Sequence, residues 1–202
     1  MKSVVFLLCL SILFSNYLSS QENKLKLHSI SFSFPSIYFD NHTGGLTFSL
    51  DIGFKKEKHI YKLFALSGSE FTFSILGPSK REDFHEIDLL YGRELIVNKW
   101  LYFDFYGGLG LFNQTITIPV AIPGTGGSCG FGGFCINIPD YEYIRNKNKT
   151  IGLSLQSKIR FKTSKRFSLG IQLHTNINSV NTIYSSGIFF QWEFESRKKQ
   201  KL

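Results

Sequence analysis

Hydrophobic and polar residues alternate along the C-terminal part of the chain. From Ile151 to Phe161 every second residue except Ser157 is apolar, and the positions between them carry Gly, Ser, Gln, Lys and Arg. The alternation resumes over residues 167–174 and again over residues 187–194. Because successive side chains of a strand point to opposite faces, the pattern predicts three strands, each with one apolar and one wetter face.

The same period of two predicts five further strands upstream, and the connections between the eight strands alternate between tight turns and longer loops. The upstream strands are expected at 24–34, 46–54, 61–75, 86–92 and 101–111, the first with a bulge where its apolar phase switches between Leu27 and Ile30. Tight turns are expected at 55–58, 98–99 and 162–165, and loops at 35–43, 77–83 and 113–149. An even strand number with this rhythm is expected of an outer-membrane barrel with short periplasmic turns and longer outside loops. The sequence therefore predicts an all-β fold, an eight-stranded antiparallel up-and-down transmembrane β-barrel.

The N-terminal segment has the features of a secretory signal peptide. Lys2 supplies the positive start, residues 4–14 form an apolar stretch, and two serines end the segment. About eleven apolar residues are too few to span a bilayer as a helix. We therefore expect export after removal of residues 1–20, with residues 21–202 forming one barrel domain.

Composition and charge narrow the function classes. Aromatic residues make up 16% of the chain and charged residues only 19%, which lies on the apolar, β-rich side of ordinary composition. The formal net charge is +8, but the basic residues lie in the expected turns and in a basic tail at 195–202, not in a stripe with stacking aromatics. The sequence therefore predicts no nucleic-acid partner, and predicts solvated turns that contact anionic lipid headgroups.

The two faces of the expected strands favour lipid outside and polar groups inside. Large aromatics collect at the tight-turn ends, as in the girdle where a barrel meets the headgroups. The expected girdle includes Trp100, Tyr102, Trp192 and Phe194. Ionisable residues collect on the other face, where a closed barrel would bury them as a paired network, because an unpaired buried charge is costly. The expected interior network contains Asp51, Lys62, Glu70, Asp88, Asp104, Lys158, Arg160, His174 and Glu193. A soluble barrel with its apolar face inside would show the same periodicity.

Two cysteines lie in the longest expected loop. Cys129 and Cys135 are separated by five residues, which in an exported protein favours a disulfide that closes a small loop. A metal pair is the alternative, but no Cys or His lies nearby in the sequence to complete a tetrahedral site. Phe131 and Phe134 in this loop are candidate contact residues, because long loops on rigid barrels commonly carry recognition.

With these features the chain resembles the small eight-stranded outer-membrane barrels of Gram-negative bacteria, in particular those of Bacteroidetes-type organisms. The resemblance rests on the signal segment ending at Ser20, on the strand 101–111 and on the last strand 187–194. It implies residence in the outer membrane, contact with outer-membrane lipid and insertion by the barrel assembly machinery. Barrels of this kind often end on an aromatic residue, whereas Phe194 is followed here by a basic tail. We further expect a monomer without a cofactor, whose surface partner the sequence does not name.

A limited resemblance to the lipid A deacylase barrels raises an enzymatic alternative. Those barrels carry a His-x-Ser-Asn run in a late strand, and this chain has His174-Thr-Asn176. Asn176 stands at the nucleophile position and cannot attack an ester, so nucleophilic catalysis lacks an essential group. His174 is instead expected to bond an interior carboxylate such as Glu193. We predict a non-enzymatic surface or envelope protein that acts through its long loop; a soluble lipocalin-like binder and a lipid A-modifying enzyme are the alternatives.

Overall fold

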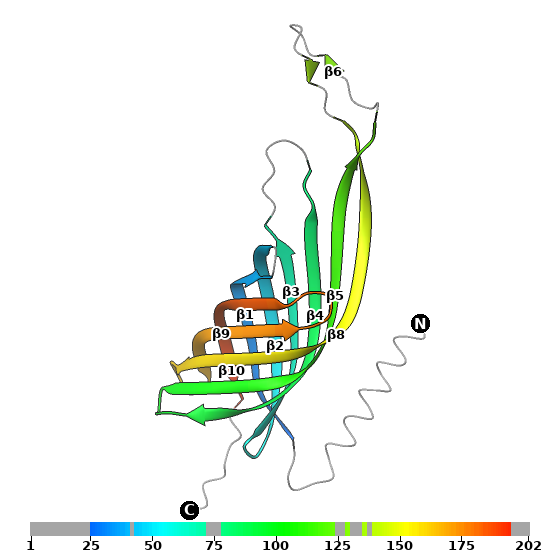
Figure 1. Cartoon of the computed structure of the whole chain (residues 1–202). Coiled ribbons are helices and arrows are strands. Elements are labelled where there is room, and N and C mark those ends of the chain that lie inside the picture. The colour runs from blue at the N-terminus through cyan, green and yellow to red at the C-terminus, as the bar shows by residue number, and fades with distance from the viewer. Residues whose placement is uncertain are drawn as a thin grey trace, which may run out of the picture.

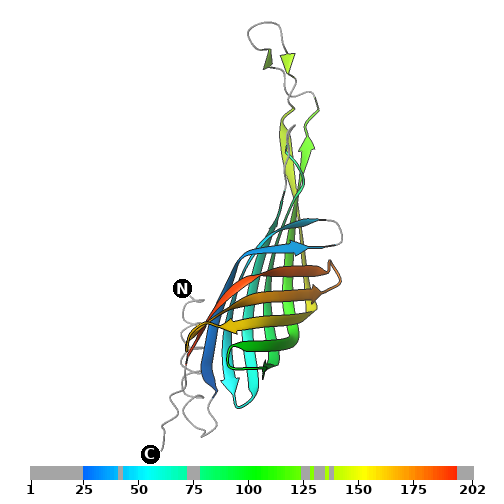
Figure 2. The same ribbon diagram turned by 90° about the vertical axis from the view of Figure 1, so that its left-hand side faces the viewer.

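Eight antiparallel strands join edge to edge and close into a barrel (Figure 1, Figure 2). The computed structural model describes residues 25–40, 43–71, 78–123, 128–129, 135–136 and 139–194. No helix long and apolar enough to cross a membrane is found among them. The barrel strands are β1 (Lys26–Phe39), β2 (Gly44–Lys56), β3 (His59–Glu70), β4 (Arg81–Ile96), β5 (Leu101–Ala121), β8 (Tyr141–Lys162), β9 (Phe167–Ile177) and β10 (Ile183–Glu193). Two short strands, β6 (Ser128–Cys129) and β7 (Cys135–Ile136), pair separately.

The predicted up-and-down order is confirmed, and the predicted rhythm of the connections is confirmed in part. Each barrel strand pairs with the strands before and after it, and β1 closes the ring against β10. Short turns join β2 to β3, β4 to β5 and β8 to β9 at one end. At the other end the connections at 71–80 and 122–140 are long, whereas those at 40–43 and 178–182 are as short as turns. Because short turns of outer-membrane barrels face the periplasm, we call these the periplasmic end and the outer end.

Strand β1 is longer than the sequence pattern predicted. The expected bulge is present, because the register between β1 and β2 shifts between Leu27 and Ser29. The predicted loop beginning at Pro35 is wrong. The strand passes through this proline, and a second register shift between Ser33 and Ser36 returns it to pairing on both sides. Proline removes one ladder donor, and the irregularity lets the flanking residues keep their partners.

Strands β5 and β8 continue well beyond the other strands at the outer end (Figure 1, Figure 2). They stay paired from the periplasmic turn as far as Ala121 opposite Tyr141. The predicted loop at 113–149 is therefore wrong for both of its arms, which are strand. Pro119 suggested a loop in the sequence, but it lies past the last pair between β4 and β5, where a missing N–H costs no second ladder bond.

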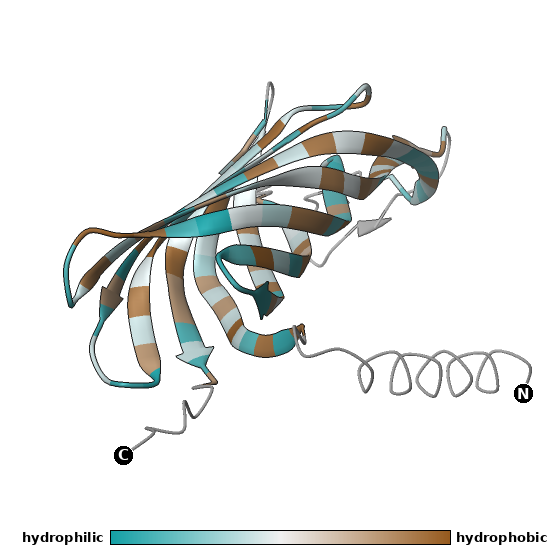
Figure 3. Ribbon diagram, turned by 90° about the horizontal axis from the view of Figure 1, so that it is seen from below, coloured by the Kyte–Doolittle hydropathy of each residue, from teal (hydrophilic) through white to brown (hydrophobic). Residues whose placement is uncertain are grey.

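Apolar and polar residues alternate along the strands (Figure 3). The outer surface of the barrel is apolar and much of its interior is polar. Leu46 is 38% exposed, and Leu169 and Phe190 share this outward orientation. Asp51 and Arg160, by contrast, are 2% and 1% exposed and lie inside. A soluble barrel would have the opposite arrangement, so the lipocalin-like alternative is wrong. A surface of this kind is stable against hydrocarbon, which places the barrel in a membrane.

The interior also contains a hydrophobic core that the alternation did not predict. Near the outer end the rings of Tyr38 and Phe84 meet edge to face with centroids 4.8 Å apart, and Phe84 and Phe112 lie 5.6 Å apart. A Cβ at Gly68, opposite Phe84 in the register, would come within 2.3 Å of the Phe84 ring, so glycine makes room for it. The expectation of an interior filled by polar side chains therefore holds for only part of the interior. The core consists of Tyr38, Ile60, Phe64, Leu66, Phe84, Leu90, Tyr106, Phe112 and Ile183.

Candidate functional site: interior clusters and outer hairpin

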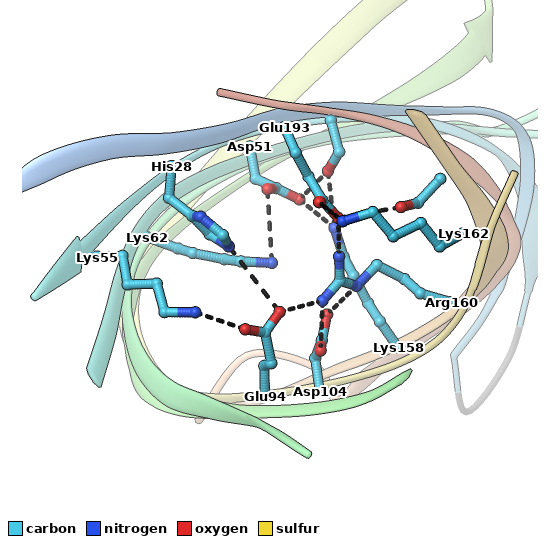
Figure 4. A network of polar contacts seen from close by, with 12 residues as sticks. His28, Asp51, Lys55, Lys62, Glu94, Asp104, Lys158, Arg160, Lys162 and Glu193 are labelled. Carbon is cyan, nitrogen blue, oxygen red and sulfur yellow. Dashed lines mark hydrogen bonds and ion pairs between the residues drawn. The ribbon is translucent and has the colours of Figure 1, made fainter. Parts of the chain in front are cut away.

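Arg160 on β8 is the centre of an ionic cluster at the periplasmic end of the interior (Figure 4). Its guanidinium donates to both carboxylate oxygens of Asp104, at 2.7 and 3.1 Å. It also donates to Glu94 at 2.5 Å and to Glu193. Lys162 donates to Glu193 as well, at 2.7 Å. Because arginine carries five N–H donors in a planar fork, one side chain can hold three carboxylates and tie β4, β5 and β10 to β8.

A second group of charges lies beside this cluster and further from the periplasmic turns. Lys158 donates to Asp51 Oδ2 at 2.5 Å, and Lys62 Nζ lies 3.5 Å from Asp51 Oδ1. The Lys62 ammonium also lies 3.8 Å from the centroid of the Tyr106 ring, and the Lys158 ammonium 4.4 Å from that of Phe189. Aromatic faces attract cations, so these rings replace part of the hydration that both lysines lose on burial.

Glu86, Asp88 and His174 form a separate buried cluster closer to the outer end. His174 Nε2 lies 3.1 Å from Glu86 Oε1 and 3.7 Å from Asp88 Oδ2. Asn176 and Ser154 donate to the same Glu86 oxygen, at 2.5 and 3.1 Å. Three donors on one oxygen indicate an ionised Glu86. Neither oxygen of Asp88 accepts a hydrogen bond from any residue in the described part of the chain, although its side chain is fully buried.

The same three residues contain the donor atoms that could hold a metal ion, since these atoms all lie within 4.8 Å of one another. His174 Nε2 faces the Glu86 oxygen that Asn176 and Ser154 also bond, so the contacts among the described residues are those of a hydrogen-bond network. His174 bonds an interior carboxylate, as expected, but the partner is Glu86 and not Glu193, which bonds Arg160 in the other cluster.

The structure distributes the expected interior residues over separate clusters instead of one network. Asp88 and His174 belong to the outer cluster, and apolar Leu90 follows Asp88 on the inner face of β4. Glu70 lies in neither group: it ends β3, opposite Gly45 at the outer end. The periplasmic groups contain Asp51, Lys62, Asp104, Lys158, Arg160 and Glu193.

Two central carboxylates, Glu86 and Glu94, were missing from the expected network. Both lie on the inner face of β4 together with Asp88, because residues of equal parity share a face. Glu86 is the first residue of the expected strand 86–92 and lies on its polar face. Glu94 fell beyond the expected end, whereas β4 continues to Ile96. Extending the alternation by one pair would have found it.

The expected aromatic girdle is divided by the structure. Trp100, Trp192 and Phe194 are exposed on the outer surface at the periplasmic end, by 54%, 49% and 40%. Tyr102 points inward, with its ring centroid 4.9 Å from the guanidinium carbon of Arg160. Its assignment to the girdle is therefore wrong. Trp100 belongs to the turn before β5, where strand alternation does not apply, so its orientation does not carry over to Tyr102.

The tip of the hairpin holds the cysteine loop. The register of the two short strands places Cys129 directly opposite Cys135. A cross-strand disulfide requires such closely facing Cα atoms, so the register supports the expected pairing. Phe131 and Phe134, the expected contact residues, lie outside the described residues, as do the expected signal peptide 1–20 and the basic tail.

No protein-family model and no curated protein matches this chain. Solved structures share its fold. Neisserial surface protein A is similar with a TM-score of 0.58 and 9% identity, over 83% of this chain and 97% of that one. The attachment invasion locus protein Ail of Yersinia pestis has a TM-score of 0.50 and 12% identity, over 84% of this chain and all of that one. Their fold, together with the apolar exterior and the charged interior described above, identifies this chain as a small eight-stranded outer-membrane β-barrel.

Proposed function

We propose that this barrel is a non-enzymatic surface protein that binds a partner protein through the hairpin of β5 and β8. The observation that carries the proposal is the reach of this hairpin beyond its neighbours (Figure 2). The last pair of β4 with β5 joins Arg81 to Thr117, and the last pair of β8 with β9 joins Leu153 to Ile177. Beyond these pairs each hairpin strand pairs with no further strand of the described residues, so the outer edges of residues 118–121 and 141–144 are free for another chain.

The free end of the hairpin exposes apolar side chains away from the barrel. Ile118 faces Ile144 in the register, and Pro119 faces Tyr143. Tyr143 and Ile144 are 55% and 50% exposed, and Ile118 and nearby Val120 are exposed as well. Apolar groups that neither core nor lipid covers commonly mark interaction sites. Together with free strand edges they suit a protein that adds a strand and covers these side chains.

The contacts of His174 support a non-enzymatic role. Its imidazole is the group that resembled a catalytic residue in the sequence, yet it is 2% exposed and bonds Glu86. The hydroxyl of Ser154 donates to the same carboxylate and not to the imidazole. A nucleophile needs a base within hydrogen-bond reach and access to its substrate, and lipid substrates meet the outside of this barrel.

The test is a hairpin-shortened variant that lacks residues 118–144 and joins Thr117 to Arg145 through an Asn-Gly turn. Its matched control replaces residues 72–77, in a different outer loop, with Gly and Ser. Cells displaying equal amounts of each heat-modifiable barrel are scored for attachment to host cells and matrix proteins. We expect wild type and control to attach and the shortened variant to lose attachment. Equal attachment by all three would exclude the hairpin as the binding element.

A further inference from the structure

The outward face of β4, β5 and β8 changes from apolar to polar at one level of the barrel. Ile87, Leu111 and Ile151 form a row across these strands and are 55%, 62% and 65% exposed. The apolar belt ends at this row, because the next outward residues toward the outer end are polar on all three strands. Those residues are His85, Asn113 and Lys149.

Three cations follow the edge of the belt along β8. Arg145, Lys147 and Lys149 point the same way as Ile151, because β8 pairs with β5 without a register shift. All three are exposed, and none forms an ion pair with another described residue. Alternate residues of a strand lie about 7 Å apart, so these cations form a basic strip roughly 13 Å long.

Little acidic charge opposes the basic strip of Arg145, Lys147 and Lys149. In the three polar rows above the belt the acidic residue is Asp83, and Arg81 donates to it from Nε and Nη2, at 3.1 and 3.0 Å. This pair neutralises itself and leaves the strip uncompensated. The face therefore attracts anions at the level where hydrocarbon gives way to headgroups.

Two adjoining hollows on this face differ in character: the lower one is largely apolar and the upper one is polar and basic. The lower one, of about 430 Å³, spans the end of the belt and is lined by Ile87, Leu111 and Ile151 together with Lys149. The upper one, of about 820 Å³, is lined by the two other cations of the strip, by the Arg81–Asp83 pair and by threonines of β5. His85 lines both hollows, so they adjoin. A ligand that occupies both is apolar at one end and anionic at the other.

We propose that this face binds the phosphorylated headgroup of an outer-leaflet lipid. The phosphate lies against Arg145, Lys147 and Lys149, whose N–H groups form charge-assisted hydrogen bonds with its oxygens. The first carbons of the acyl chains cover Ile87 and Leu111. A soluble phosphate gains nothing from the apolar hollow, which favours a membrane lipid as the occupant. Binding at this level does not depend on a partner at the free end of the hairpin.

The experiment compares three full-length barrels in nanodiscs of neutral phospholipid that contain diphosphorylated lipid A or the same lipid without its phosphates. The test variant is Arg145→Gln/Lys147→Gln/Lys149→Gln. The matched control, Lys56→Gln/Lys58→Gln/Lys165→Gln, removes equal charge at the periplasmic end. After extraction into mild detergent, native mass spectrometry counts the lipid A retained per barrel, and a heat-shift gel verifies folding of each. Single Lys147→Gln repeats the measurement if the triple variant does not fold.

We expect wild type and control to retain phosphorylated lipid A, and the strip variant to retain at least about tenfold less, since each basic residue adds to the attraction. No barrel should retain the dephosphorylated lipid, and pyrophosphate should not displace the bound lipid. Retention by the strip variant equal to wild type would overturn the proposal. Equal retention of dephosphorylated lipid would show apolar contact alone, and displacement by pyrophosphate would show a soluble-anion site; either would also overturn it.

Discussion

Asp104 and Arg160, diagonal neighbours on β5 and β8, form a two-point ion pair inside the barrel, with N–O distances of 2.7 and 3.1 Å. The pair fixes the plane of the guanidinium, whose remaining donors then reach Glu94 and Glu193. A buried charge cluster adds little net stability over an apolar core, but removing one partner leaves charges that nothing compensates. Arg160 therefore compensates the buried carboxylates in the periplasmic half of the interior, and the stability of that half depends on it.

Arg160→Met should lower the free energy of unfolding by about 3–5 kcal/mol, because three buried carboxylates lose their shared partner. Unfolding by urea in lipid vesicles, followed by tryptophan fluorescence, measures the loss. Lys162→Met is the matched control. Its side chain is partly exposed and contacts one of these carboxylates, so we expect a loss below about 1 kcal/mol. Equal losses in the two variants would contradict the central role of Arg160.

Glu86→Gln should destabilise the barrel, whereas Asp88→Asn should not. Asn at position 88 removes a buried carboxylate that accepts no hydrogen bond from a described residue, and its amide can donate to Glu86. We expect Asp88→Asn to be neutral or stabilising by about 1 kcal/mol, and Glu86→Gln to cost about 2–3 kcal/mol because three donors lose a charged acceptor. The same urea titration measures both. A clear loss of stability in Asp88→Asn would contradict this expectation and would indicate that the Asp88 carboxylate pairs with a cation.

Tyr102 should be shielded from lipid, unlike the tryptophans near it. In a Trp100→Phe/Trp192→Phe background, Tyr102→Trp places the single indole on the inner face, beside Arg160. Brominated lipids should quench this indole weakly, whereas single tryptophans at 100 or 192 lie on the outer surface and should be quenched strongly. Steady-state fluorescence in vesicles makes the comparison. Strong quenching at position 102 would return Tyr102 to the girdle.

Cys129 and Cys135 should form a disulfide that the barrel itself does not need. Their register supports the bond, while the strands that carry them pair outside the ring. We expect both thiols of the mature protein to resist alkylation until it is reduced. Cys129→Ser/Cys135→Ser should leave barrel stability within about 0.5 kcal/mol of wild type, as for other changes remote from the core. Two freely alkylated thiols in unreduced protein would refute the pairing.

The faces of the strands could be predicted from the sequence, whereas their ends could not. Alternation follows from the period of two, and it held for Leu46 and Asp51, which face outward and inward as expected. The ends of the strands depend on whether a neighbouring strand is present to pair with them. Pro35 and Pro119 are tolerated in strands because a register shift or a missing neighbour removes the need for their N–H, and neither condition is visible in local sequence.

Most members of the charged interior were predictable, Glu86 and Glu94 excepted, but their partners were not. Lys158 meets Asp51 and His174 meets Glu86 across the barrel, from strands that are not adjacent in the ring. Such contacts depend on the stagger and closure of the whole sheet, which residue spacing does not encode. The interior apolar core was missed for a related reason: Phe64 and Leu66 disturbed the alternation in the sequence, and only the closed ring shows that they face inward.

The seam between β1 and β10 sets a condition on how the protein can be made. It joins the first strand of the ring to the last, so no N-terminal portion of the chain can seal itself. A polypeptide without its final strand would expose two unpaired strand edges to the bilayer. The hydrocarbon core offers no hydrogen-bond partners for the backbone N–H and C=O groups of these edges. We therefore expect a chain that ends before Ile183 to leave the edges of β1 and β9 unpaired and not to form this barrel.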